Sequence, residues 1–281
     1  MTADIRAVES LMAFWADAGV EVAYADAPVD RTVQTAALLK TKSDAAPGRG
    51  AVPIGAPAAP APRKMTFVAP VAAPAPPAAD EARRLAAAAQ DLDALAKAIA
   101  DFDGCGLKFE GARQAVFSRG SPDAPVMIIG EGPGADEDAQ GAPFVGRAGK
   151  LLDRMIAAAG LEGRVFITNT VFWRPPGNRT PSPDEQLACA PFLERAIALV
   201  KPRVLLLAGG ASAKSVLKQT TGILALRGRW FEWKSEDGAL EIPAMPTLHP
   251  AFLLRQPAAK KKAWEDFLTL AERVDRPDRP A

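Results

Sequence analysis

Three separate segments of the chain carry the side chains best suited to chemistry. His249 is the only histidine, so any imidazole chemistry must use it. Asn169 ends the apolar run RVFITN (164–169), and its amide offers a donor and an acceptor, which suits recognition of an amide-like edge. The loop GEGPGADEDAQGAPFVGRAG (130–149) carries three successive acids and one aromatic residue, Phe144. There a carboxylate could orient water or stabilise a cation, and the ring could stack on a planar group.

Each of these residues also has a structural interpretation. The acids could be solvated, the ring could belong to the core, and the asparagine and histidine could serve in turns. Gly130, Gly132 and Ala135 also match a G-x-G-x-x-A dinucleotide fingerprint. That match is weak, because Pro133 and the residues after it delay the helix whose N-terminal amides would meet a pyrophosphate, and the three acids would repel one.

Composition narrows the possible partners and metal sites. Lys and Arg number 34 against 33 Asp and Glu, so no overall basicity predicts a nucleic-acid partner, and any such binding needs basic residues gathered on one face. Two cysteines and one histidine are too few for a Cys₄ or Cys₂His₂ zinc or iron–sulfur site, and they favour a reducing compartment. The sequence has no apolar run of eighteen residues and no signal-peptide pattern. We therefore expect a cytoplasmic protein that does not enter a membrane.

The chain divides by composition into a short helix, a linker and one larger domain. Residues 1–24 have apolar side chains at three- and four-residue spacing, which predicts an amphipathic helix that docks on the domain or on a partner protein. Residues 25–79, rich in proline and alanine, predict a disordered tether, with a docking segment for another protein as the alternative. We expect the globular domain over 80–275 and a tail over 276–281.

Beyond the linker, short apolar runs alternate with helical patterns. We expect four buried strands, at 125–130, 164–169, 203–208 and 242–248. Helices are expected at 81–102, with Asp80 as N-cap, and at 146–159, 183–200, 210–218 and 258–274. This alternation predicts an α/β fold of three layers, α/β/α, around a central, mainly parallel four-stranded sheet. Ligands of such sheets bind beyond the carboxyl ends of the strands. The glycine-rich loop 130–149, Asn169 and His249 all lie at or after such strand ends.

Several segments together resemble the family 4 uracil-DNA glycosylases, an iron–sulfur type. They are the loop 130–149, TNTVFWRPPGNRTPSPDE (168–185), RVLLLAGGASAKSVL (203–217), LRGRW (226–230) and LHPAFLLR (248–255). The resemblance runs from about Gly104 to Phe267 in the family's order and spacing. It implies a uracil-DNA glycosylase-like fold and a monofunctional enzyme. Such an enzyme flips uracil out of DNA and hydrolyses its N-glycosidic bond, which starts base-excision repair.

The resemblance also implies roles for individual residues. Glu137 would orient the attacking water and face the developing positive charge on the sugar, and His249 would support the negative charge on the departing uracil. Phe144 would stack on the flipped base and Asn169 would hydrogen-bond its Watson–Crick edge. Glu131, with the loop backbone at Gly132, would shape the pocket.

A second group of residues is expected to contact DNA. Arg174 and Arg179, in a proline-stiffened loop, could meet phosphates. After the histidine, Phe252, Leu253 and Leu254 resemble the apolar wedge that opens a base step. Arg255 and the lysine run that starts at Lys260 could follow the phosphate backbone, although a solvated helix start explains the lysines equally well.

The sequence departs from the family at the iron–sulfur cysteines. Cys105 and Cys189 occupy two of the four cluster positions, while Phe102 and Trp173 stand at the other two. Two thiolates cannot hold a four-ligand cluster, so we expect no metal and no cofactor. We expect the two aromatics to pack together as a hydrophobic plug, with the cysteines as small apolar neighbours.

Two other functions are alternatives to the glycosylase. One is a uracil-DNA binding protein without turnover, and another is an adaptor tethered to a polymerase or repair complex. The expected partner is uracil-containing DNA, single- or double-stranded, bound by a monomer of bacterial type at the nucleoid. A further protein could bind the N-terminal helix.

Overall fold

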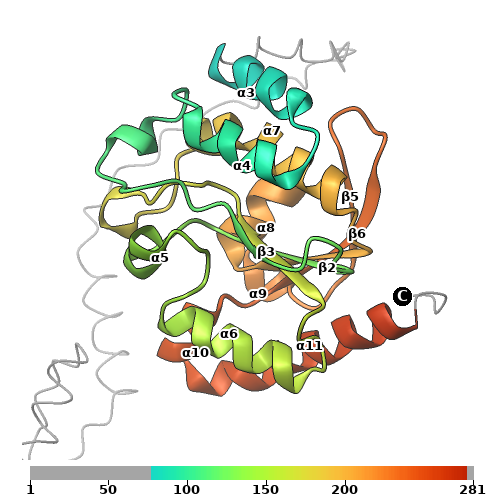
Figure 1. Cartoon of the computed structure of the whole chain (residues 1–281). Coiled ribbons are helices and arrows are strands. Elements are labelled where there is room, and N and C mark those ends of the chain that lie inside the picture. Colours follow the sequence, from blue (N-terminus) through green and yellow to red (C-terminus); the bar gives the residue numbers. More distant parts are fainter. Residues whose placement is uncertain (1–76, 277–281) are drawn as a thin grey trace, which may run out of the picture. The chain divides into compact units, whose positions relative to one another are not determined.

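The computed structural model describes residues 77–276, which form an α/β domain around one six-stranded sheet (Figure 1). The strand order is β1-β3-β2-β4-β6-β5. The central strands are parallel neighbours, in the order β3 (Val165–Asn169), β2 (Val126–Gly130), β4 (Val204–Ala208) and β6 (Glu241–Thr247). The predicted parallel core is therefore confirmed, and its carboxyl ends lie at one edge of the sheet.

The prediction of four strands was too low, because two antiparallel strands close the edges. β1 (Ser118–Gly120) pairs with β3, and β5 (Phe231–Lys234) pairs with β6. β1 is only three residues long, and β5 has one buried residue among exposed ones. Neither strand has the continuous apolar run by which a strand buried on both faces is recognised.

Helices cover both faces of the sheet, which confirms the three-layer prediction. On one face, Met127 and Ile129 of β2 pack with α3 (Pro77–Ala88), α4 (Leu92–Asp101), α7 (Pro183–Val200) and α8 (Gly210–Leu217). On the other, Val126 and Ile128 pack with α6 (Arg147–Ala158) and α11 (Lys260–Asp275). Figure 1 shows these two groups of helices on opposite sides of the strands. Successive side chains of a strand point to opposite faces, so β2 contacts both layers.

The helix predicted over 81–102 is in fact two helices. α3 begins at Pro77, so Asp80 lies inside its first turn and does not cap it, and the last three residues assigned to the linker are helical. α3 ends at Ala88, and a new helix, α4, begins after Asp91. Asp91 caps α4 by accepting a hydrogen bond from the backbone N–H of Ala94 (2.8 Å). Asp91 satisfies a backbone donor that the new helix would otherwise leave unpaired.

Three short α-helices occupy segments where no element was predicted. They are α5 (Ala135–Gln140), α9 (Ile223–Leu226) and α10 (Pro250–Arg255), and three 3₁₀ turns accompany them at Gly106–Phe109, Pro176–Asn178 and Pro257–Ala259. α5 and α10 follow the carboxyl ends of β2 and β6, so they position the residues around the site.

The predicted helix over 1–24, the linker as far as residue 76 and the tail from residue 277 lie outside the described residues. Between residues 77 and 276, no helix combines the length and apolar character that crossing a bilayer requires.

Candidate active site

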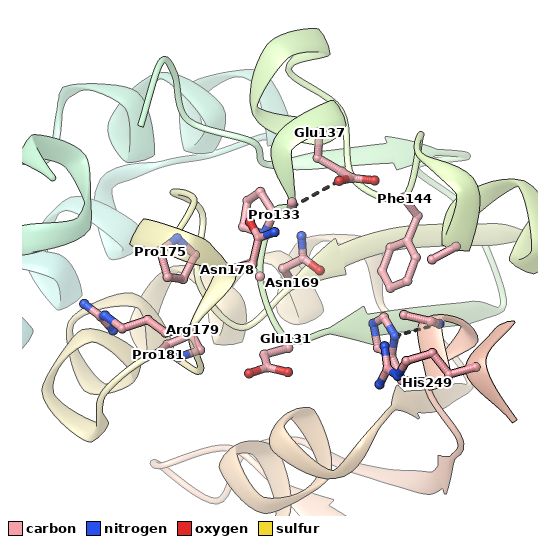
Figure 2. A pocket seen from close by; sticks show the side chains of 15 residues that line it. Glu131, Pro133, Glu137, Phe144, Asn169, Pro175, Asn178, Arg179, Pro181 and His249 are labelled. Carbon is pink, nitrogen blue, oxygen red and sulfur yellow. Dashed lines mark hydrogen bonds between the residues drawn. The ribbon is translucent and has the colours of Figure 1, made fainter. Parts of the chain in front are cut away.

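A cavity of about 440 Å³ opens at the carboxyl ends of β2, β3 and β6 (Figure 2). It brings together all six side chains or backbone positions that the sequence assigned to catalysis and base binding: Glu131, Gly132, Glu137, Phe144, Asn169 and His249. Arg179 and Arg255 also line it, whereas Arg174, Leu253, Leu254 and Lys260 do not. The cavity is therefore the candidate active site.

Asn169 ends β3 and is only 1% exposed. Within the described domain neither its amide nitrogen nor its amide oxygen has a hydrogen-bonding partner. A buried polar group without a partner costs about 1–3 kcal/mol, so a ligand that supplies the missing bonds is expected to bind here. The absence of a side chain at Gly130 leaves space for Asn169 and Phe144, because a Cβ there would lie 2.3 Å from Oδ1 of Asn169 and 2.6 Å from the Phe144 ring.

Glu137 connects the two ends of the glycine-rich loop. Its Oε1 accepts hydrogen bonds from the backbone N–H groups of Val145 (3.0 Å) and Gly146 (2.9 Å), and its Oε2 accepts one from Gly134 (3.1 Å). Gly134 and Gly146 are the N-caps of α5 and α6, so one carboxylate ties together the starts of two helices. Because Oε2 accepts only this one bond, it can still accept another from a water molecule in the cavity.

Phe144 has the left-handed backbone conformation, with φ of +55°. For a residue other than glycine this costs roughly 1–3 kcal/mol, and such strain is concentrated at functional sites. The conformation turns the chain between the acidic loop and α6, and the ring lies against His249, with ring centroids 5.6 Å apart and planes inclined by 29°. Glycine is required at position 149, because a Cβ there would lie 1.7 Å from the Phe144 carbonyl oxygen.

His249 caps the N-terminus of α10. Its Nδ1 accepts a hydrogen bond from the backbone N–H of Ala251 (3.1 Å), so the neutral ring carries its proton on Nε2. Burial lowers the pKa of His249 to about 4, and the positive charge of Arg255 acts in the same direction, while Glu137 opposes both. At neutral pH the imidazole is therefore uncharged and offers one N–H donor.

Comparison with known proteins places the chain in a family. The uracil DNA glycosylase superfamily model matches residues 117–268, more than half of the chain. The chain belongs to this superfamily.

Several relatives of the chain are named Type-4 uracil-DNA glycosylase. That of Sulfurisphaera tokodaii is 42% identical, covering 59% of this chain and 77% of the relative. That of Saccharolobus solfataricus is 40% identical, and the match covers 65% of this chain and 86% of the relative. That of Pyrobaculum aerophilum is 37% identical, and the match covers 63% of this chain and 91% of the relative. These matches confirm the resemblance that the sequence motifs indicated.

Asn178 is a cavity residue of this glycosylase-superfamily domain that the sequence did not single out (Figure 2). It follows Gly177, and both residues have positive φ, +56° and +63°. Its Oδ1 accepts a hydrogen bond from Nε of Arg174 (2.8 Å), which leaves its amide nitrogen as a donor. The Pro-Pro-Gly-Asn sequence signals a tight turn, and only the fold shows that this turn borders the cavity.

The basic residues of the predicted DNA-binding face differ in their surroundings. Arg179 forms ion pairs with Glu185 (2.6 Å) and Glu110 (3.1 Å), and the hydrogen bonds to Glu185 raise its pKa further above its usual value. Its guanidinium is thus paired with carboxylates of the protein itself. Arg255 and Lys260 are exposed.

The predicted apolar wedge after His249 is only partly available. Leu253 is fully buried in a small cluster with Leu248 and Ala263, so it anchors α10 and cannot face DNA in this conformation. Leu254 is 38% exposed. Because Leu253 is buried, its predicted role as a DNA contact is corrected to a packing role.

The region of the family's cluster cysteines is filled by packed side chains. Sγ of Cys105 and Sγ of Cys189 lie 3.8 Å apart, and both residues are fully buried. Phe102 and Trp173 share their hydrophobic cluster. The ring centroids of Phe102 and Phe192 are 5.1 Å apart, and those of Trp173 and Phe172 are 6.4 Å apart. Phe172 and Phe192 also contact each other, so these two rings connect Phe102 to Trp173.

These residues do not fit a four-thiolate cluster. Two of the four ligand positions carry the aromatic side chains of Phe102 and Trp173, so only the two thiols of Cys105 and Cys189 remain as possible ligands in this region. Throughout residues 77–276, no group of three or more His, Cys, Asp or Glu side chains could hold a metal ion.

Proposed function

We propose that this protein is a uracil-DNA glycosylase that starts base-excision repair. The observation that carries the proposal is the unpaired amide of Asn169, buried at the base of the cavity. Its oxygen can accept from uracil N3–H and its nitrogen can donate to uracil O4. Cytosine presents the reverse pattern at both positions, so it would leave both partners unpaired, and mismatches of this kind allow strong rejection.

The cavity implies that the base leaves the DNA helix. A uracil stacked in a duplex cannot reach an amide that is 1% exposed, so the nucleotide must flip out at a cost of a few kcal/mol. Leu254, exposed beside the cavity wall formed by Ala251 and Arg255, is the residue we assign to the vacated stack. Arg174, Arg255 and Lys260 would hold the flanking phosphates, while Arg179 would chiefly shape its loop.

Hydrolysis then requires a water molecule, a carboxylate and a donor. As the bond between C1′ of the sugar and N1 of uracil breaks, its electron pair leaves with the base and the sugar becomes cationic. Oε2 of Glu137 would face that cation, orient the water whose oxygen joins C1′, and accept the proton that this water loses. The Nε2–H of His249 would donate to O2 of the departing uracil anion, and Phe144 would stack on its ring.

A second carboxylate lines the same cavity. The Glu131 side chain forms no hydrogen bond within residues 77–276, although its backbone carbonyl accepts one from the Thr170 hydroxyl, whereas the Glu137 carboxylate accepts three backbone N–H groups. Replacing each by glutamine, one at a time, separates the two: the variant that loses single-turnover excision while retaining its folded stability marks the carboxylate that acts on the sugar and water.

The test of the function uses a labelled oligonucleotide with one uracil, followed by alkali to cut abasic sites. We expect scission by the native protein and none by a matched oligonucleotide with cytosine. The Arg164→Met variant, which breaks a remote ion pair with Asp275, serves as the control and should cut normally. Tight uracil-dependent binding without scission would instead indicate a binding protein. The absence of both binding and scission would favour an adaptor.

The neutral imidazole predicts a flat pH profile. With a pKa of about 4, His249 stays in its active, uncharged form, so the single-turnover rate constant should change little between about pH 5.5 and 8. The unfolded chain binds this proton near pH 6.5 and the folded protein does not, so the free energy of unfolding should fall as the pH drops from about 6.5 to 4. A tenfold loss of rate centred near pH 6.5 would contradict the assignment.

The aromatic plug predicts a colourless protein. Purified under anaerobic conditions, the protein should contain no stoichiometric iron and no absorbance band near 400 nm, because Phe102 and Trp173 stand where ligands would be needed. Iron analysis and the visible spectrum check this, and a relative with all four cysteines provides the positive control. A brown protein with bound iron would refute the plug.

The monomeric state, a protein partner for residues 1–24 and an association with the nucleoid stay predictions of the same proposal. Sedimentation of the full chain with and without uracil-containing DNA tests the first.

A further inference from the structure

Arg119 stands outside the cavity but acts on its wall. It lies on the edge strand β1, and its guanidinium reaches the turn that ends in Phe144. Nε donates to the carbonyl of Pro143 (2.7 Å), and Nη2 donates to the carbonyl of Phe144 (3.1 Å). One arginine therefore holds the carbonyl groups on both sides of the Phe144 backbone N–H and Cα.

The guanidinium is itself held by a carboxylate. Its Nη2 also forms an ion pair with Asp153 of α6 (2.6 Å), and the Arg119 side chain is 28% exposed. The carboxylate thus draws the guanidinium toward the first turns of α6, where Gly149 leaves room for the Phe144 carbonyl. A bidentate, rigid donor of this kind cannot be reproduced by lysine.

The amides just after Phe144 are held by the opposite charge. Glu137 accepts the N–H groups of Val145 and Gly146, while Arg119 donates to the carbonyls of Pro143 and Phe144. The peptide group that follows the left-handed residue is therefore held at its carbonyl by a cation and at its N–H by an anion. A backbone conformation that Phe144 would not adopt alone persists only where its surroundings fix it in this way.

We propose that Arg119, anchored by Asp153, is a positioning residue that holds Phe144 in the conformation needed to stack on the flipped base. The inference rests on the proposed function for the identity of that base. It assigns to β1, a strand without a side chain in the cavity, the task of setting the geometry of one cavity wall. The contact between the rings of Phe144 and His249 extends this control to the donor of the leaving group.

The experiment compares Arg119→Met with Arg164→Met, which also removes an arginine from an ion pair but at the amino end of β3. We expect Arg119→Met to lower the single-turnover rate constant at saturating enzyme by about 10–100-fold, because small displacements of a positioned group have effects of this size. The affinity for uracil-containing DNA should stay nearly unchanged, since phosphate contacts dominate it. Arg164→Met should behave as the native protein.

Two further measurements separate positioning from a general loss of stability. In a Phe144→Ala background, Arg119→Met should slow excision little further, because the arginine acts through the missing ring. Equal slowing in both backgrounds would overturn the proposal. If Arg119→Met does not fold, Asp153→Asn takes its place, since it loosens the guanidinium and keeps the backbone contacts.

Amide hydrogen exchange tests the same contacts without any substrate. In Arg119→Met the N–H groups of Val145 and Gly146 should exchange faster than in the native protein, because the turn is released. Unchanged exchange would refute the positioning role even in an active enzyme. Faster exchange in a protein that never excises uracil would leave the turn as described and refute only the proposed function.

Discussion

Replacing Asn169 by leucine is expected to abolish uracil excision and to raise the thermal stability of the protein. Leucine has a similar size but cannot form the two hydrogen bonds that select uracil, and sites of this type lose about 10⁴-fold when such bonds are missing. In the free protein the Asn169 amide is buried without a partner, so its removal should relieve about 1–3 kcal/mol. For a domain of this size each kcal/mol corresponds to about 2–4 °C in the melting temperature.

The neighbouring Thr168 provides a matched control. It is also fully buried on β3, but its hydroxyl donates to the carbonyl of Phe117 (2.8 Å). Thr168→Val should therefore lower the melting temperature and leave excision nearly intact, the opposite pattern on both measurements. Calorimetry and single-turnover excision check the pair. A destabilised Asn169→Leu protein would show that the amide has a partner in solution, such as a held water molecule.

Replacing His249 by alanine is expected to slow excision by about 10²–10³-fold, the usual effect of removing one preorganised donor to a developing negative charge. The affinity for uracil-containing DNA should change little, because the phosphate contacts are untouched. His249→Gln should recover part of the rate, since its amide can also donate. Single-turnover kinetics with binding measured separately test this, and an alanine variant that excises at the native rate would exclude the histidine from the chemistry.

The alanine variant should also lose some stability. Nδ1 of His249 accepts the N–H of Ala251 at the start of α10, and a lost helix cap typically costs about 0.5–2 kcal/mol. A loss of that size, too small to unfold the domain, leaves the kinetic result interpretable.

The sequence predicted the parallel centre of the sheet well because each of its strands is a continuous apolar run. The same criterion missed β1 and β5, since an edge strand needs only one buried face and can be as short as Ser118–Gly120. The hairpin joining β5 and β6 carries an Asp-Gly pair at 237–238, a turn signal that would have revealed it.

The cavity residues were predictable where a motif placed them after a strand. Asn169 and His249 are of this kind, and so is Phe144 within the glycine-rich loop. Leu253 was assigned wrongly because the segment LHPAFLLR forms a helix, α10, and helical periodicity turns this leucine inward and Leu254 outward.

Arg119 could not be inferred from sequence at all. It lies 25 residues before Phe144 and 34 before Asp153, and only the pairing of β1 with β3 brings the three together. Asn178 was missed for a related reason, because a turn residue next to two prolines gives no sign of which cavity it borders.

The packing around Cys105 and Cys189 has a consequence for when such an enzyme can work. A domain held together by a metal cluster folds only as fast as cells can supply and protect the metal, and oxidants or iron starvation remove it. Here the same region is closed by Phe102, Trp173 and their neighbouring rings, all encoded by the chain itself. Iron chelators, which would unfold a domain that depends on a cluster, should leave this face of the sheet folded.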